Sequence, residues 1–274
     1  MKIWLAILLA ACPISLRAQL EWVLEDAPQV VFAGEARKIR VAFSNPTDKT
    51  VEVQIRTRLF QSSSATAMPL GQAQPWKKVQ VLAGQTIIES ATLSFPAVKV
   101  GTRFLVHWLD ERGKVLGPTE ITVHPPGLLK ELKALAGERS LGVFDPRDQL
   151  KPLLKQLMVD FEDLEQTGWE NFSGRLAIVG PLTPQDQSPT DLASRIKSAA
   201  KAGRAVVWMQ LPSRPPTDLE LPAYLIREGD GTVVVARSKT FSELAENPRG
   251  QLILVHLASL ALKPEGWEST VFTP

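Results

Sequence analysis

The stretch that decides the fold is Gly174-Arg175-Leu176-Ala177-Ile178-Val179-Gly180-Pro181, followed downstream by Ala202-Gly203-Arg204-Ala205-Val206-Val207-Trp208-Met209-Gln210. Each contains a short apolar run of the length and composition of a buried strand. Residues 189–202 lie between them with the spacing of an amphipathic helix, which Gly203 ends as a C-cap. Strands that alternate with helices in this way predict a mostly parallel sheet with helices on both faces.

The same alternation continues on both sides of this stretch. Together the elements predict a three-layer α/β/α domain over residues 140–274, in which two late strands pair around the turn Glu228-Gly229-Asp230-Gly231. Further strands are expected at 141–144, 161–164, 224–227 and 232–236, and helical segments at 149–158, 241–246 and 251–262.

Residues 20–125 have a different period. Ile39, Val41 and Phe43 alternate with Lys38 and Arg40, as expected for a strand with one buried and one solvent face. About seven short strands of this kind, separated by turn residues, predict an immunoglobulin-like β-sandwich of the disulfide-free type. The Ser-, Ala-, Gln- and Pro-rich segment 60–77 breaks the pattern and is expected to be a long loop or an irregular edge.

A domain boundary is marked by Pro125-Pro126-Gly127, after which leucines fall on one helical face. The expected organisation is therefore a sandwich over 19–125, a linker helix over 126–139 and the α/β domain over 140–274.

The first eighteen residues have the parts of a secretion signal: Lys2, the apolar run 3–11 and a small residue at a cleavage point after Ala18. The run is too short to span a bilayer, which takes roughly 20 residues. Cleavage there leaves a soluble periplasmic or secreted protein that begins at Gln19. Alternatively, Leu9-Ala10-Ala11-Cys12 resembles a lipobox, and a lipidated Cys12 would make the protein a membrane-anchored lipoprotein.

Composition narrows the possible functions. The formal net charge is +2, with Lys2 and Arg17 both in the leader, and neither half has the basic excess of a nucleic-acid binder. Cys12 is the single cysteine, so its removal leaves no thiol chemistry and no disulfide. We expect no cofactor, no metal and no nucleic acid, and a partner that is another envelope or secreted protein.

The two quoted runs and the helix between them resemble the class I glutamine-amidotransferase-like superfamily, a flavodoxin-like group, over about half the chain. In that family a buried strand precedes a helix that ends in Gly, and a second buried strand follows. Active members carry a Cys on a sharp turn after a central strand, with a downstream His and Glu. Here the turn is Val179-Gly180-Pro181-Leu182, so the resemblance implies a non-catalytic member.

Other catalytic patterns are equally incomplete. There is no Gly-x-Ser-x-Gly, and His107, His124 and His256 are scattered without metal-ligand spacing. His107 and His256 are expected to be structural. The carboxylates Glu162, Asp163 and Glu165 could serve a glycosidase, but they form a surface cluster just as naturally.

An open α/β sheet binds small ligands beyond the carboxyl ends of its strands, at the point where the strand order reverses. The residues expected there are Asp145, Gly180 and Gln210, although Asp145 could instead cap the following helix. The leading hypothesis is an exported, non-enzymatic interaction or scaffold protein. The alternatives are an envelope enzyme or accessory that acts on carbohydrate or peptide with cleft carboxylates, and a small-ligand sensor.

Overall fold

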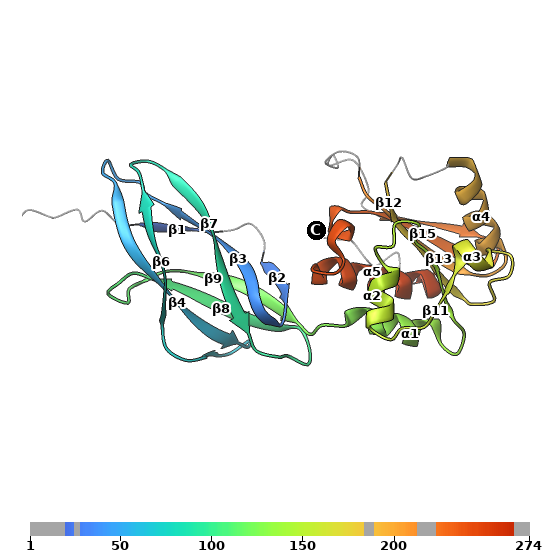
Figure 1. Cartoon of the computed structure of the whole chain (residues 1–274), viewed down its shortest axis with the longest axis horizontal. Helices are drawn as coiled ribbons and strands as arrows, with labels where there is room; N and C mark the ends of the chain where they lie inside the picture. Colours follow the sequence, from blue (N-terminus) through green and yellow to red (C-terminus); the bar gives the residue numbers. More distant parts are fainter. Residues whose placement is uncertain (1–19, 25–27, 184–188, 213–222, 266–274) are drawn as a thin grey trace, which may run out of the picture. The chain divides into compact units, whose positions relative to one another are not determined.

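The structure, a computed structural model, describes residues 20–24, 28–183, 189–212 and 223–265. The chain divides into two compact units, the first formed mainly by residues before 122 and the second mainly by residues after it. Figure 1 shows that the first is built of strands and the second of strands and helices. The protein is therefore a multidomain β plus α/β chain. The leader 1–18 and Cys12 lie outside the described residues, and the exact domain limits expected from the sequence remain predictions.

The β unit contains two sheets. One has the order β1-β3-β7, and the other has the order β2-β9-β8-β4-β5, with β6 also paired to β4. The pairings of β4 with β5, β6 and β8 are all antiparallel. The strands are β1 (Glu21–Val23), β2 (Gln29–Phe32), β3 (Gly34–Ser44), β4 (Val51–Ser62), β5 (Ala67–Pro69), β6 (Gln74–Val81), β7 (Thr86–Phe95), β8 (Thr102–Leu109) and β9 (Val115–His124).

Alternation along the strands builds the core of this unit. Ile39, Val41 and Phe43 of β3 are fully buried, as their period-2 spacing predicts. The Phe43 ring meets the Trp108 ring of the other sheet edge-on, with centroids 6.0 Å apart. The indole N–H of Trp108 donates to the Thr119 hydroxyl at 2.8 Å, which satisfies the buried polar group of the largest core side chain.

Of the two forms expected for 60–77, the long loop was wrong in its main part, and the irregular edge is closer, because β5 lies at the end of its sheet. β4 runs on to Ser62, β5 covers Ala67–Pro69, and β6 begins at Gln74. Trp76 of β6 packs on Trp108 with ring centroids 5.0 Å apart, so an aromatic anchor holds a segment whose composition is weak for strands.

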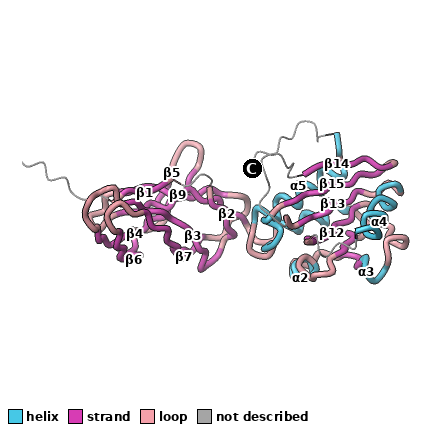
Figure 2. Tube along the Cα trace, turned by 90° about the horizontal axis from the view of Figure 1, so that it is seen from above, coloured by secondary structure: helices cyan, strands magenta, loops and turns pink. Residues whose placement is uncertain are grey.

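The α/β unit has a sheet of six strands in the order β11-β10-β12-β13-β15-β14 (Figure 2). All neighbours are parallel except β14, which is antiparallel to β15. The strands are β10 (Leu141–Phe144), β11 (Phe161–Asp163), β12 (Leu176–Leu182), β13 (Ala205–Gln210), β14 (Ala223–Glu228) and β15 (Gly231–Arg237). The expected late hairpin is present, with its turn between β14 and β15.

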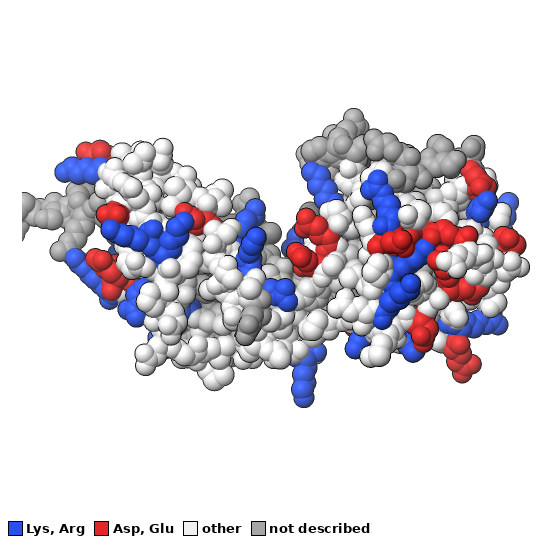
Figure 3. Space-filling model, viewed as in Figure 1, with Lys and Arg blue, Asp and Glu red and all other residues white. Residues whose placement is uncertain are grey.

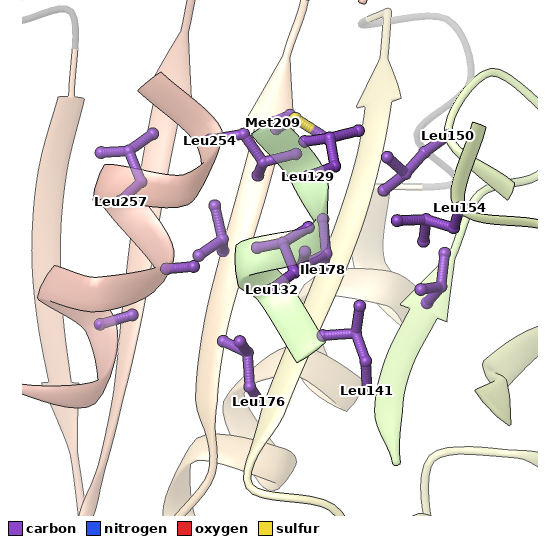
Figure 4. Close-up of a cluster of buried hydrophobic side chains, with 14 of the residues drawn as sticks. Leu129, Leu132, Leu141, Leu150, Leu154, Leu176, Ile178, Met209, Leu254 and Leu257 are labelled. Carbon is purple, nitrogen blue, oxygen red and sulfur yellow. The ribbon is translucent and has the colours of Figure 1, made fainter. Parts of the chain in front are cut away.

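Helical segments cover both faces of this sheet, and each face has its own apolar cluster. On one face, Leu129 and Leu132 meet Leu254 and Leu257 of α5 over the strand residue Ile178 (Figure 4). On the other, α3 and α4 cover a cluster that includes Val179 and Val206. The helices are η1 (Leu128–Lys130), α1 (Glu131–Ala136), α2 (Lys151–Gln156), α3 (Leu164–Thr167), α4 (Pro189–Lys201), η2 (Lys239–Glu243) and α5 (Pro248–Leu262).

One strand end differs from the expectation in a way that matters for the site. β12 does not stop before Gly180-Pro181 but runs through this dipeptide, whose peptide bond is cis, to Leu182. Over the described ranges, no helix is long and apolar enough to cross a membrane.

Candidate functional site

The candidate site is the carboxyl edge of the parallel sheet, where the strand order reverses. From β10 the chain first adds β11 on one side of β10 and then crosses to add β12 on the other side. The strand order therefore reverses between β10 and β12. Asp145 directly follows β10, and Gly180 lies within β12. Gln210 ends β13, which is separated from β10 by β12, a span of roughly 10 Å at normal strand spacing. The structure therefore brings Asp145 and Gly180 to the reversal point and places Gln210 one strand beyond it.

Asp145 is fully buried and serves the helix that follows it. Its Oδ2 accepts hydrogen bonds from the backbone N–H groups of Leu150, at 2.6 Å, and Lys151, at 3.0 Å. Leu150 directly precedes α2 and Lys151 is its first residue, so the helix itself offers these N–H groups no acceptor. The contacts match the helix-capping role that the sequence left open for Asp145.

Gln210 and Thr183 are engaged with arginine side chains along the same edge. The Gln210 Oε1 accepts from Arg237 Nε at 2.9 Å, and Gln210 is only 8% exposed. Arg147, in the loop after β10, donates from Nη2 to the Thr183 hydroxyl at 3.4 Å. Because Arg147 follows β10 and Thr183 follows β12, this hydrogen bond crosses the reversal point and bridges the position of a ligand cleft.

Gly180 is a packing position. Its φ is +90°, which a residue with a Cβ rarely adopts, and the residue is buried inside β12. A Cβ at this position would lie 2.6 Å from the carbonyl oxygen of Met209 and 2.7 Å from the backbone nitrogen of Leu182. Gly180 therefore admits the close approach of β13, on the side of β12 that faces away from β10.

Lys151 is the centre of an ion-pair cluster at this edge that no sequence pattern indicated. The Lys151 side chain is 8% exposed, and its Nζ lies 3.0 Å from Asp163 Oδ2 and also bonds Glu165 Oε2. Asp163 ends β11 and caps α3 by accepting from the Glu165 N–H at 3.1 Å. Charged side chains of both signs gather over the part of the unit that carries α2 and α3 (Figure 3). The spacing 151, 163 and 165 gives no sequence signal, because only the parallel pairing of β10 with β11 brings these residues together.

The surroundings of Lys151 shift the pKa values of its two carboxylate partners in opposite directions. Burial lowers the pKa of Lys151, but hydrogen bonds and charges from Glu165 and Asp163 outweigh it and raise the pKa. Burial raises the pKa of Asp163, yet the Lys151 hydrogen bond and the Glu165 N–H bring it below its ordinary value. Burial dominates at Glu165, whose pKa is raised in spite of Lys151. Lys151 is thus held as a cation between two carboxyl groups of unequal acidity.

The remaining candidates lie apart from this edge. The His107 ring packs on Phe60 with centroids 4.4 Å apart, and its pKa is lowered by burial and by the charge of Arg58. His256 is an exposed residue of α5. In the ranges that the structure describes, no group of three His, Cys, Asp or Glu side chains is arranged to hold a metal ion.

Two hollows of the α/β unit lie away from the reversal point. One, of about 550 Å³, borders the edge strand β11 and includes Met158, Phe161 and Asp163. The other, of about 360 Å³, lies between Trp169, α4 and Arg204, at the amino end of β13.

Comparison with known proteins leaves the family open. No known family model matches the sequence, and no curated protein matches it. Solved structures with partial likeness include a β-glucosidase from Listeria innocua, at 17% identity over 39% of this chain and 16% of that one, with a TM-score of 0.30. A Pseudomonas fluorescens alkylpurine DNA glycosylase matches at 16% identity over 39% and 31% of the two chains, with a TM-score of 0.31. A Niemann-Pick type C2 protein from Japanese carpenter ant matches at 8% identity over 34% and 78%, with a TM-score of 0.27.

The chain spans less than a third of the length of the first two of these proteins. At TM-scores near 0.3, these likenesses carry no argument about fold or function.

Proposed function

We propose that this chain is an exported, non-enzymatic interaction or scaffold protein. In this proposal an immunoglobulin-like sandwich is joined to a degenerate, amidotransferase-like α/β domain, and the partner is another envelope or secreted protein. The observation that carries the proposal is that each charged or amide side chain at the carboxyl edge contacts another part of the fold, through Asp145 Oδ2, Gln210 Oε1 and Lys151 Nζ.

Each of the three expected site residues has a structural use. The Asp145 carboxylate binds the first amides of α2, Gln210 binds Arg237, and Gly180 admits the Met209 carbonyl. A catalytic carboxylate needs a free oxygen within reach of substrate. The Asp145 Oδ2 accepts from two N–H groups, and its Oδ1 is buried without a hydrogen-bond partner among the described residues, so neither oxygen is exposed to a substrate.

The fold supports the proposal that the α/β domain resembles the amidotransferase-like superfamily but lacks its catalytic residues. β12, the Gly203-terminated α4 and β13 follow one another as the resemblance implies, and β12 is parallel to β13. The place of the family's nucleophile turn is taken by Gly180-Pro181, which is buried inside β12. The antiparallel strands and the Phe43–Trp108 contact between sheets support the immunoglobulin-like part of the proposal.

One observation favours the alternative of a carboxylate enzyme. Asp163 and Glu165 have pKa values displaced in opposite directions, and pairs of this kind perform acid and base steps in glycosidases. Against this role, both carboxylates share the same lysine, which must be displaced before either can act.

Two measurements on one preparation test the proposal. The full chain is expressed in an exporting bacterium, and the recovered protein is analysed by intact mass and N-terminal sequencing. A start at Gln19 in the soluble fraction supports export as a soluble protein, and a lipidated Cys12 in the membrane fraction supports the anchored form. Uncleaved protein in the cytoplasm would contradict export.

The same protein is then incubated with glutamine, with peptidoglycan fragments and with short peptides. The proposal predicts no ammonia release and no hydrolysis. Turnover that Glu165→Gln abolishes, while the matched variant Glu162→Gln retains it, would establish the enzymatic alternative instead.

A further inference from the structure

The edge strand β11 has no role in the proposed function. Among the residues that the structure describes, β11 is the outermost strand of the sheet and pairs with β10 alone. Within the described part of the chain, no strand other than β10 pairs with Phe161–Asp163, although the backbone of Asp163 is also used at the start of α3. An edge strand of this kind can accept an extended segment of another chain through main-chain hydrogen bonds.

A hollow lies directly beside this edge. It has a volume of about 550 Å³ and is bordered by Met158, Val159, Phe161 and the α2 residue Lys155. Strand addition takes its specificity from pockets that receive alternate side chains of the incoming segment. The hollow is in the correct place to receive one such side chain.

Met158 gives this hollow an apolar rim at a conformational cost. It adopts φ +55° just after α2, and Val159 N–H donates to the Leu154 carbonyl at 2.9 Å, as in the glycine-type helix ending. A methionine is unfavourable in this backbone region. Its side chain is nevertheless 76% exposed, where it gains little from packing in the isolated protein.

Charge defines the kind of partner. Asp160, Glu162 and Asp163 bring three carboxylates to the edge. Lys133 pairs with the first of them, Lys151 pairs with the last and with Glu165, and Lys155 borders the hollow. Glu162 forms no ion pair with any residue that the structure describes. A basic segment would be complemented here. A second copy of this chain would not, because antiparallel pairing of 161–163 with itself places Glu162 opposite Glu162.

We propose that residues 158–163 are a docking edge for an extended, basic segment of a partner protein. The segment adds a strand beside β11, places an apolar side chain against Met158 and Phe161, and sets its cations near Glu162 and Asp160. This proposal rests on the interaction role argued above and names the surface and the partner chemistry for it.

The test uses the exported protein and the probe peptide acetyl-Lys-Val-Lys-Phe-Lys-Val-amide. Backbone amide shifts are followed by NMR during titration. Two matched peptides serve as controls: one with Glu in place of each Lys, and one with N-methyl groups at alternate residues, which cannot donate the strand hydrogen bonds. The expected result is saturable shifts centred on 158–163 with the first peptide and none with either control.

Variants separate the side chain from the backbone strain. Met158→Ala keeps the strained backbone and Met158→Gly relieves it, and both are expected to weaken binding by about fivefold or more because both remove the apolar contact. Met68→Ala removes an exposed methionine of the β unit and should leave the affinity unchanged. Since Met158→Gly is expected to be more stable than the parent, its loss of binding cannot come from unfolding.

Several outcomes would overturn the docking edge: no shifts at 158–163, equal binding of the acidic or the N-methylated peptide, or self-association through β11. Specific binding elsewhere on the protein would also overturn it but would leave the interaction role intact. Cleavage of the probe peptide, detected by mass spectrometry, would contradict the proposed non-enzymatic function itself.

Discussion

At the scale of single residues, the polar side chains of the carboxyl edge stabilise the fold. The sequence indicated Asp145 as a site or a cap, because aspartate after a strand is common in both roles. It gave no sign of Lys151, whose two partners lie 12 and 14 residues further along the chain. Long-range ion pairs of this kind follow from strand pairing, and no local spacing announces them.

Replacement of Lys151 by Met should lower the free energy of unfolding by about 2–4 kcal/mol, because Asp163 and Glu165 are then left partly buried without a cation. Urea denaturation measures the change. Lys155→Ala, an exposed lysine one turn further along α2, is the control and should alter stability by less than about 0.5 kcal/mol. A similarly small change for Lys151→Met would contradict the role given to this ion pair.

The same lysine predicts a pH dependence. Its pKa is raised in the folded state, so its contribution is complete below the ordinary lysine value near 10.5 and is lost as the pH rises through the folded value. The stability difference between the parent protein and Lys151→Met should therefore stay constant from neutral pH to about pH 10 and shrink above it. A difference that grows with alkaline pH would have the wrong sign for this account.

Gly180 offers a test of the close packing between β12 and β13. Gly180→Ala should destabilise the protein by more than about 3 kcal/mol, since the new methyl group collides with backbone atoms at a positive φ. Gly84→Ala separates the two causes, because Gly84 has φ +67° and open space around it, and should lose only about 1 kcal/mol. Equal losses for the two variants would show that no close approach exists at Gly180.

At the scale of elements, periodicity predicted the strands with clear alternation and failed where composition was misleading. β3 and the buried strands β12 and β13 carry strong apolar signals. The segment 60–77 was expected to be a loop or an irregular edge because Ser, Ala and Gln have little strand preference. What makes it strand is tertiary: pairing with β4 and the packing of Trp76. β12 was likewise expected to end at proline, a rule that does not anticipate a strand continuing through Gly180-Pro181.

The packing of Trp76 on Trp108 is therefore expected to stabilise β6 in the sheet. Trp76→Ala should cost about 2–3 kcal/mol, because the ring packs on Trp108 and lies 6.5 Å from Phe43. Lys78→Ala, two residues further along the same strand, removes only an exposed ion pair with Glu52 and should change stability by less than about 0.5 kcal/mol. Thermal unfolding of both variants is followed by circular dichroism. For Lys78→Ala, which keeps Trp76, it is also followed by tryptophan fluorescence. An unchanged melting temperature for Trp76→Ala would contradict the conclusion that the Trp76 ring holds this segment in the sheet.

At the scale of the whole molecule, the change of hydrophobic period near residue 125 predicted two units of different class, and the structure has a β unit and an α/β unit. The order of the sheet was not predictable, because parallel neighbours are chosen by packing far apart in sequence. Among the expected site residues, Asp145, Gly180 and Gln210 all lie at or near the carboxyl edge, as open-sheet topology predicts. Their chemical use was not predictable, because it depends on partners that only the fold supplies.

The central claim is that this edge is built for stability and not for catalysis, and Asp145 tests it most directly. Urea unfolding of Asp145→Ala should show a loss of about 2 kcal/mol, because two N–H groups at the start of α2 lose their acceptor. A buried catalytic carboxylate behaves in the opposite way, since its removal commonly stabilises an enzyme. Unchanged or increased stability of Asp145→Ala would contradict the account.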